Sequence, residues 1–289
     1  MRYRFLRFPE GKPKAVTLSY DDGVREDIRL SEIVSSYCMK ATFNINSALM
    51  SEDSNDRHLS ANEIQEHILD KGHEIAVHGA NHVAMGIATP INGIIDVLKG
   101  RSDLEKRFKQ IVRGMAYPDS GINLFDCGNS YEQIKHSLSK LGIAYARTAC
   151  ADNNAFEMPD DWHAWMPTTH HNNPKAMEWA NEFVKLDINQ KFGTGRRPRL
   201  YYLWGHSYEF ERHDNWEVLE GLCEKLAYHD DIWYATNMEI YEYVMAYQSL
   251  VFSVDNSMVS NPTMHTVWFD VDGEQYKISP GETILIANL

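Results

Sequence analysis

Stretches with the apolar pattern of buried β-strands alternate with stretches of helical periodicity along most of this chain. Such alternation is typical of parallel sheets, in which a helix returns the chain to the start of the next strand. The pattern predicts seven strands, at residues 14–20, 41–46, 74–78, 112–117, 143–148, 200–204 and 231–235. We therefore expect an α/β protein, although the alternation alone does not distinguish a closed barrel from an open doubly wound sheet.

Capping signals mark the starts of several helices between these strands. Ser60 and Glu63 form a capping-box pattern ahead of a helix predicted at 61–71, and Gly72 is suited to end that helix in a left-handed conformation. Two later helices are predicted from similar pairs, Asp214 with Glu217 and Thr236 with Glu239.

After about residue 250 the chain changes to short alternating runs separated by Asn-Pro, Asp-Gly and Pro-Gly turns. This pattern predicts a small antiparallel β appendage over residues 250–289, packed on the main domain or on a partner subunit. Residues 1–249 are then the candidate catalytic domain.

Charge and cysteine usage exclude several classes of protein. The formal charge of −13 argues against binding to nucleic acid or to an anionic membrane. The four scattered cysteines indicate neither a disulfide scaffold nor a thiolate zinc cluster. Because no signal peptide or membrane span is recognisable, we expect a cytoplasmic protein.

Unusual polar residues follow the predicted strands at their carboxyl ends, the face where α/β proteins build their sites. Asp21 and Asp22 follow the first strand, His78 and His82 the third, and His206 the sixth. Four segments, including 118–121 after the fourth strand, are thus expected to converge on one rim.

The two histidines and one aspartate would give a divalent cation three ligands and leave one position open for water, an arrangement suited to hydrolysing an amide or ester. The second aspartate could then accept the proton of the water, and His206 could protonate the leaving group. Each element also has a simpler interpretation: two unrelated loop histidines, an Asp-Asp-Gly turn or helix cap, and a core histidine beside Trp204.

Together these segments resemble the polysaccharide deacetylases of the NodB-homology group, carbohydrate esterase family 4. Residues 17–23, Thr-Leu-Ser-Tyr-Asp-Asp-Gly, are similar to the T-F-D-D-G motif of the family, and residues 78–82 to its H-[ST]-x-x-H motif, with Gly79 at the hydroxyl position. Leu203-Trp-Gly-His206 is similar to the late L-x-H segment. The resemblance implies a distorted (β/α)7 barrel with Asp21 as base, Asp22, His78 and His82 as metal ligands and His206 as acid.

The chain departs from the family at the usual R-x-P-[YF]-G segment, where Ala116 replaces the arginine that orients the catalytic aspartate. Arg147, at the end of the fifth strand, is our candidate replacement; a surface or helix-capping role is the alternative. The family also implies a backbone N–H from the loop containing Tyr117, Pro118 and Asp119, directed at the substrate carbonyl.

The family's Asp-Trp pair is represented by Asp161-Trp162. Trp162 could stack on a sugar or belong to the core or a lid. We interpret His170 and His171 as polar loop residues rather than metal ligands.

The sequence therefore predicts a metal-dependent hydrolase that removes an acetyl group, in particular an N-acetyl group from an amino sugar, oligosaccharide or polysaccharide, and does not cleave peptide bonds. Zinc is the expected metal, with Co²⁺, Ni²⁺ and Mn²⁺ as alternatives, and an acetylated carbohydrate is the expected partner. An allantoinase-like cyclic amide hydrolase and a non-catalytic carbohydrate-binding module remain alternative functions. A homo-oligomer is left open.

Overall fold

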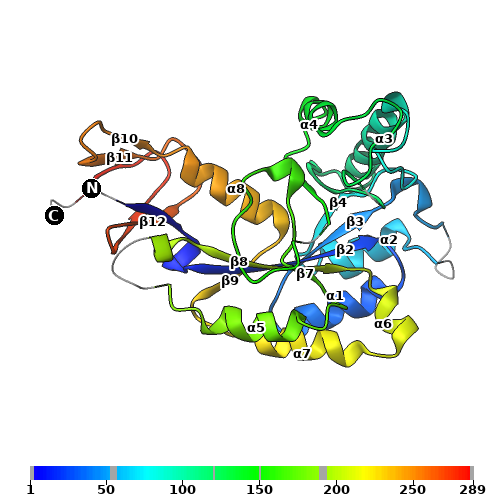
Figure 1. The fold of residues 1–289 in the computed structure, drawn as a ribbon, viewed down its shortest axis with the longest axis horizontal. Helices are drawn as coiled ribbons and strands as arrows, with labels where there is room; N and C mark the ends of the chain where they lie inside the picture. The colour runs from blue at the N-terminus through cyan, green and yellow to red at the C-terminus, as the bar shows by residue number, and fades with distance from the viewer. Residues whose placement is uncertain (1–2, 53–56, 120, 150, 189–193, 287–289) are drawn as a thin grey trace.

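The computed structural model describes residues 3–52, 57–119, 121–149, 151–188 and 194–286. A parallel sheet runs through the centre of the molecule with helices on its two sides (Figure 1). Its strands are β2 (Lys14–Asp22), β3 (Ala41–Ile45), β4 (Glu74–Val77), β5 (Gly114–Ala116), β6 (Tyr145–Arg147), β7 (Thr169–His170), β8 (Arg199–Gly205) and β9 (Ile232–Tyr234). All seven predicted strands form. The additional strand, β7, has two residues, too few to produce a recognisable periodicity.

The sheet is curled, with strand order β6-β5-β4-β3-β2-β8-β7 and β9 paired to the first part of β2. An isolated parallel bridge between Arg147 and Trp165 links β6 to the segment that continues into β7. The two ends of the strand order are therefore joined through residues 165–170. The prediction of a distorted (β/α) barrel with additional antiparallel strands at the C-terminus is confirmed.

Eight α-helices are described, and short 3-10 turns lie at Pro9–Gly11, Ser47–Leu49, Trp162–Ala164 and Thr194–Arg196. The helices are α1 (Glu26–Ser36), α2 (Ala61–Ile64), α3 (Pro90–Phe108), α4 (Tyr131–Lys140), α5 (Ala176–Lys185), α6 (Tyr208–His213), α7 (Trp216–Leu226) and α8 (Asn237–Gln248). Their apolar faces pack on the sheet, where the interior of the main cluster includes Tyr20, Phe43 and Phe183. None of the helices in the described ranges has the length and hydrophobicity needed to cross a membrane.

Two of the three predicted helix starts are observed. Ser60 with Glu63, and Thr236 with Glu239, form complete capping boxes, and α2 continues as a π-helical turn over Gln65–Leu69. The third prediction, a cap at Asp214, is wrong. Asp214 instead ends α6 in a left-handed conformation with a φ of 48°, and α7 begins at Trp216 after the N-cap Asn215.

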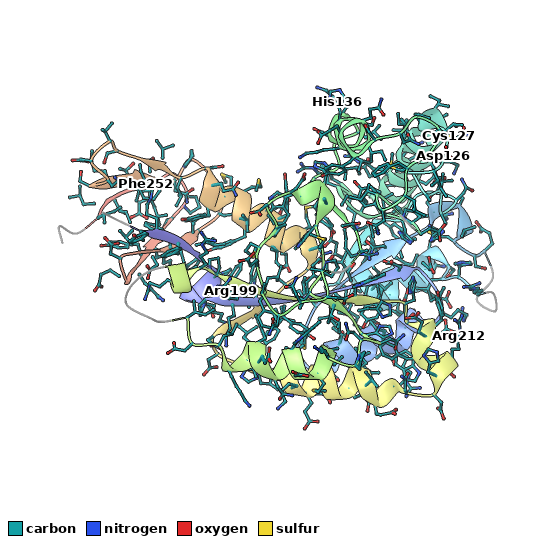
Figure 2. All side chains as sticks on the ribbon, viewed as in Figure 1. Asp126, Cys127, His136, Arg199, Arg212 and Phe252 are labelled. Carbon is teal, nitrogen blue, oxygen red and sulfur yellow. The ribbon has the colours of Figure 1, made fainter. Side chains whose placement is uncertain are left out.

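The C-terminal residues form two small antiparallel sheets at one end of the molecule, where Phe252 is labelled in Figure 2. One sheet contains β10 (Val251–Phe252), β11 (Met258–Ser260) and β14 (Thr283–Leu285). The other contains β12 (Val267–Val271) and β13 (Glu274–Ile278), and its third strand is β1 (Arg4–Arg7) from the start of the chain. The division into residues 1–249 and 250–289 stays a prediction, and the pairing of β1 with β12 was not part of it.

A buried ionic cluster joins these strands to the rest of the chain. Asp270 on β12 is fully buried, lies 3.7 Å from the Arg7 guanidinium and accepts hydrogen bonds from Arg196. Arg7 also donates to the carbonyl of Arg196 at 2.9 Å. One carboxylate thus faces two buried guanidinium groups.

Candidate active site

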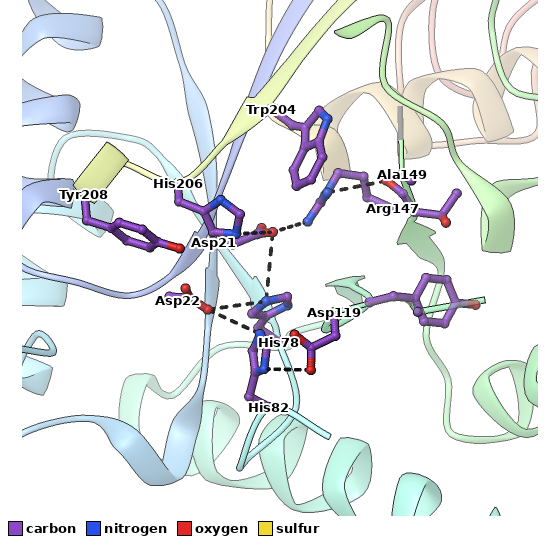
Figure 3. Close-up of a pocket in the computed structure, with 13 residues that line it drawn as sticks. Asp21, Asp22, His78, His82, Asp119, Arg147, Ala149, Trp204, His206 and Tyr208 are labelled. Carbon is purple, nitrogen blue, oxygen red and sulfur yellow. Dashed lines mark hydrogen bonds and ion pairs between the residues drawn. The ribbon is translucent and has the colours of Figure 1, made fainter. Parts of the chain in front are cut away.

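The candidate residues lie at the carboxyl ends of neighbouring parallel strands. Asp21 pairs with Asn44 on β3, Tyr20 pairs with Gly205 on β8, and Ala116 pairs with Arg147 on β6. This register places the last residues of β2 and β6, and the residues directly after β4 and β8, at one rim of the sheet. Their side chains face a common pocket of about 290 Å³ (Figure 3).

Asp22, His78 and His82 bring their ligand atoms together in this pocket. The Oδ1 atom of Asp22 lies 3.6 Å from Nε2 of His78 and 3.5 Å from Nε2 of His82, and the three ligand atoms lie within 4.8 Å of one another. Zinc bonds of 2.0–2.1 Å in a tetrahedral arrangement separate neighbouring ligand atoms by about 3.4 Å. The spacing of this donor set therefore fits a divalent cation.

The remote nitrogens of both histidines face acceptors. The Nδ1 atom of His78 donates to the carbonyl of Ala116 at 3.0 Å, which leaves the Nε2 lone pair directed into the pocket. The Nδ1 atom of His82 lies 3.6 Å from the carboxylate of Asp119. Acceptors of these kinds orient metal-ligating imidazoles, so the pocket has candidate ligands and groups able to orient them.

The loop between the two histidines is held by a buried carboxylate that the motif analysis did not identify. Asp96 on α3 accepts hydrogen bonds from the backbone N–H groups of Ala80, Asn81 and Val83 and from the Asn81 side chain, at 2.9–3.3 Å. A Cβ atom added to Gly79, which has a φ of +72°, would lie 2.2 Å from this carboxylate. Asp96 thus takes the space that a side chain at position 79 would need.

Three site residues have left-handed backbone conformations although none is glycine. The φ angles are 85° at Asp22, 60° at His82 and 47° at Asp119. Such conformations are uncommon outside glycine and collect at functional sites, where the surrounding structure enforces them.

Asp21 is buried beside the pocket and forms an ion pair with Arg147. Its other oxygen accepts a hydrogen bond from Asn44 at 2.8 Å. Burial opposes ionisation of Asp21, but Arg147, His78 and His206 together outweigh it and lower the pKa of this carboxyl below its ordinary value. Asp21 is therefore an oriented carboxylate. The structure brings together the two residues that the sequence analysis paired in place of the missing arginine.

His206 reaches the same carboxylate from the end of β8. Its Nε2 atom lies 4.0 Å from Asp21, while its Nδ1 atom lies 3.7 Å from Glu209. Burial disfavours the imidazolium, but the negative charges of Glu209 and Asp21 outweigh burial and raise the pKa of His206 above its ordinary value. The position of the ring and the raised pKa of His206 both suit a proton donor.

Of the remaining candidate residues, some line the pocket and Trp162 does not. Tyr117 and Asp119 line the pocket, but the N–H of Tyr117 already donates to the carbonyl of Arg147, and its hydroxyl donates to the carbonyl of His163. Trp162 packs edge-on against Trp165 and Tyr241, away from the pocket-lining residues. Its neighbour Asp161 binds the side chains of Lys135 and Tyr131.

Pro118 follows Tyr117 in the pocket loop, and its carbonyl accepts from the N–H of Gly121. Ser120, two residues after Pro118, lies outside the described residues. Sequence analysis missed Asn44 and Glu209. Asn44 carries no motif, whereas Glu209 lies three residues after His206 and could have been noticed from that spacing.

Comparisons with known proteins agree with this architecture. The family model described as "Polysaccharide deacetylase" matches residues 9–143. No curated protein sequence matches the chain significantly.

Similar solved structures include an allantoinase, with 12% identity and a TM-score of 0.55 over 81% of this chain and 91% of that one. A domain of a multidomain xylanase, from the hindgut metagenome of Trinervitermes trinervoides and belonging to carbohydrate esterase family 4, has 15% identity and a TM-score of 0.50 over 81% and 92%. A protein from Mycobacterium smegmatis, proposed to be a polysaccharide deacetylase, has 16% identity and a TM-score of 0.51 over 84% and 94%.

At these identities the solved structures support the fold, while the matched family model covers the segments that carry Asp21, Asp22, His78 and His82. The resemblance read from the motifs is confirmed: residues 9–143 match the polysaccharide deacetylase family, and the fold is similar to that of a structure from carbohydrate esterase family 4.

Proposed function

We propose that this protein is a metal-dependent hydrolase that removes the acetyl group from an N-acetylated amino sugar, free or within an oligosaccharide or polysaccharide. The observation that supports the proposal is the meeting of three ligand atoms, those of Asp22, His78 and His82, beside the Asp21–Arg147 pair and His206. These groups match the requirements of amide hydrolysis: a cation site, an oriented base and an acid.

Asp22, His78 and His82 would hold the cation, with zinc as the expected ion and Co²⁺, Ni²⁺ or Mn²⁺ as alternatives. A divalent ion at such a site supplies Lewis acidity that polarises a carbonyl and acidifies water. The binding energy is expected to depend on neutral imidazoles, and burial lowers the pKa of His78 in the direction that keeps it neutral.

Asp21 would accept a proton from the attacking water as the water oxygen bonds to the acetyl carbon. Arg147 and Asn44 hold the carboxylate so that it faces the pocket rather than rotating away. The tetrahedral intermediate carries a negative oxygen, and a backbone N–H of the 117–121 loop would stabilise it. Among the described residues of this loop, the N–H groups of Tyr117 and Gly121 are engaged and Pro118 has none, so we assign this role to Asp119.

His206 would then give its Nε2 proton to the amide nitrogen as the carbon–nitrogen bond breaks. The products are acetate and a free amine, since a neutral amine leaves far more readily than an amide anion. Proton return to His206 and loss from Asp21 to solvent complete the cycle.

The test is acetate release from a panel of N-acetylated and O-acetylated saccharides by the zinc-loaded protein, the chelator-stripped protein and the reloaded protein. We expect acetate from the loaded and reloaded forms only. His206→Ala should keep the metal and lose most turnover, while His136→Ala, at an exposed position on α4, should change neither. A stoichiometrically loaded protein that releases no acetate from any member of the panel would contradict the proposal.

The absence of the usual arginine at Ala116, and the likeness of the fold to an allantoinase, favour hydrolysis of a cyclic amide as the second candidate. Mass spectrometry distinguishes the two reactions, because ring opening adds the mass of water without releasing acetate. Saccharide binding by the metal-loaded protein with no product of either kind would instead indicate a binding module.

A further inference from the structure

A second polar cluster lies behind His206, on the side away from Asp21. It contains Glu209 on α6 and two histidines at the end of β7. The same carboxylate oxygen of Glu209, Oε2, lies 3.3 Å from Nε2 of His170, 3.1 Å from Nε2 of His171 and 3.7 Å from Nδ1 of His206. The amide of Asn172 also donates to this oxygen at 3.2 Å.

The spacing of His170, His171 and Glu209 would also suit a cation, but the protonation of His170 opposes this interpretation. The backbone N–H of Asn172 donates to Nδ1 of His170 at 3.1 Å, so Nδ1 carries a lone pair. A neutral imidazole then has its proton on Nε2, the atom that faces Glu209. That atom turns its proton toward the carboxylate, 3.3 Å away, and has no lone pair to offer a metal.

His206 connects this cluster to the active site through its two nitrogens. Nδ1 is buried and makes no hydrogen bond with the described residues, and the carboxylate of Glu209 faces it. Nε2 faces Asp21 and the pocket. An imidazolium at this position therefore lies between two carboxylates, one on the side of the substrate and one on the side of the protein interior.

We infer that Glu209 is a positioning residue for the acid step, with His170, His171 and Asn172 holding its carboxylate against Nδ1 of His206. This inference rests on the proposed function. Glu209 would keep a proton on Nδ1 throughout the cycle, so that the proton on Nε2 is the one transferred to the leaving nitrogen. The transfer leaves neutral His206 with Nδ1–H facing Glu209.

The neighbours of Glu209 stabilise its charge. Burial opposes ionisation, yet His170, His171 and His206 together hold the pKa of Glu209 well below its ordinary value. His171 is buried, and burial lowers its own pKa to about 4, so it remains neutral near neutral pH. The carboxylate thus stays negative while His206 gains and loses its proton.

The test compares Glu209→Gln with a control, Glu211→Gln, at an exposed position two residues further along the same helix. For an N-acetylated substrate we expect kcat to fall on the order of 10²-fold in Glu209→Gln with KM and bound zinc unchanged. For 4-nitrophenyl acetate, whose leaving group needs no proton, we expect little change. Glu211→Gln should behave as the unaltered protein with both substrates.

An equal loss with both substrates would show a merely structural role and overturn the inference, as would binding of a second zinc ion that Glu209→Gln removes. A separate readout is the protonation midpoint of the His206 ring, followed by NMR in the zinc-loaded protein. The titratable groups that face this ring include Glu209, Asp21, Asp22, His170, His171 and Tyr208. We expect a lower midpoint in Glu209→Gln, and an unchanged midpoint would contradict the pairing. Because this readout needs no turnover, it remains informative if the proposed activity fails.

Discussion

Arg147 at the end of β6 and Asp21 near the end of β2 form a buried ion pair, although 126 positions separate them in the chain. Three strands, β3, β4 and β5, lie between β2 and β6 both in the sequence and in the sheet order. The curl of the sheet brings the carboxyl ends of β2 and β6 to one pocket. The guanidinium also lies over the ring of Trp204, 4.3 Å from its centroid. Position 116, on the neighbouring strand β5, is occupied by an alanine.

Replacing Arg147 by methionine should lower kcat on the order of 10²-fold, because a catalytic group that loses its orientation by about 1 Å forfeits that much. Bound zinc should be unchanged, since Arg147 is not among the candidate ligands. Steady-state kinetics and metal analysis measure the two effects. Arg147→Lys keeps the positive charge and is the variant to use if the methionine protein does not fold. Arg199→Met, at the first residue of β8 and far from the carboxyl end of that strand, is the control. Full activity in Arg147→Met would exclude an orienting role, whereas activity kept in Arg147→Lys and lost in Arg147→Met would support one.

Asp96→Asn should weaken zinc binding about 10- to 100-fold, the range typical when a group supporting metal ligands is altered. The substituted amide would direct an N–H group toward backbone N–H donors of the loop that carries His78 and His82. Competition with a chromophoric chelator measures the affinity. Asp103→Asn, on the same helix but partly exposed, should bind zinc normally. Equal zinc affinities in the Asp96 and Asp103 variants would mean that the loop does not depend on Asp96.

Asp270→Asn should lower the free energy of unfolding by about 3–5 kcal/mol, because it leaves the buried Arg7 and Arg196 guanidinium groups without their shared negative charge. Urea denaturation followed by circular dichroism measures the change. Glu274→Gln on β13 removes an exposed charge from the same small sheet and should have little effect. A loss below about 1 kcal/mol for Asp270→Asn would show that the cluster contributes little to stability.

Glu74→Gln should reduce the dependence of stability on pH between about 4.5 and about 7. Burial raises the pKa of Glu74 from 4.5 to about 7, so within this window the folded chain retains a proton that the unfolded chain has lost. The contribution of Glu74 is therefore complete below pH 4.5 and is lost as the pH rises through 7. Glutamine resembles the protonated side chain at every pH.

Denaturation at several pH values measures this slope, and the wild-type protein should lose roughly 3 kcal/mol more than Glu74→Gln across the window. The exposed Glu242→Gln variant on α8 serves as the control. Parallel curves for the wild-type and Glu74→Gln proteins would contradict the assignment.

Much of the main domain could be predicted because its signals are local. Strand periodicity and the capping boxes at Ser60 and Thr236 depend on residues within one turn or strand, and the structure has them. The site candidates followed from the rule that parallel strands share a carboxyl edge. Arg147 was identified because Ala116 stands where the family has an arginine, so we looked for another arginine near the same edge of the sheet.

The features that were not predicted depend on contacts between distant parts of the chain. The pairing of β1 with β12 joins residues more than 260 positions apart, and no local pattern indicates it. The two residues of β7 and the buried position of His171 depend on packing against β8 and α6. Asp214 is a residue type common at helix N-caps, but in the structure it is the C-cap of the preceding helix α6.

Arg147 takes part in two structural links, one through its main chain and one through its side chain. The main chain of Arg147 bridges to Trp165 and so joins the two ends of the strand order, while its side chain forms the ion pair with Asp21, the proposed base. A local opening of the sheet at this bridge would therefore also disturb the orientation of Asp21. Fluctuations of the barrel and the alignment of the proposed proton acceptor are thus mechanically coupled.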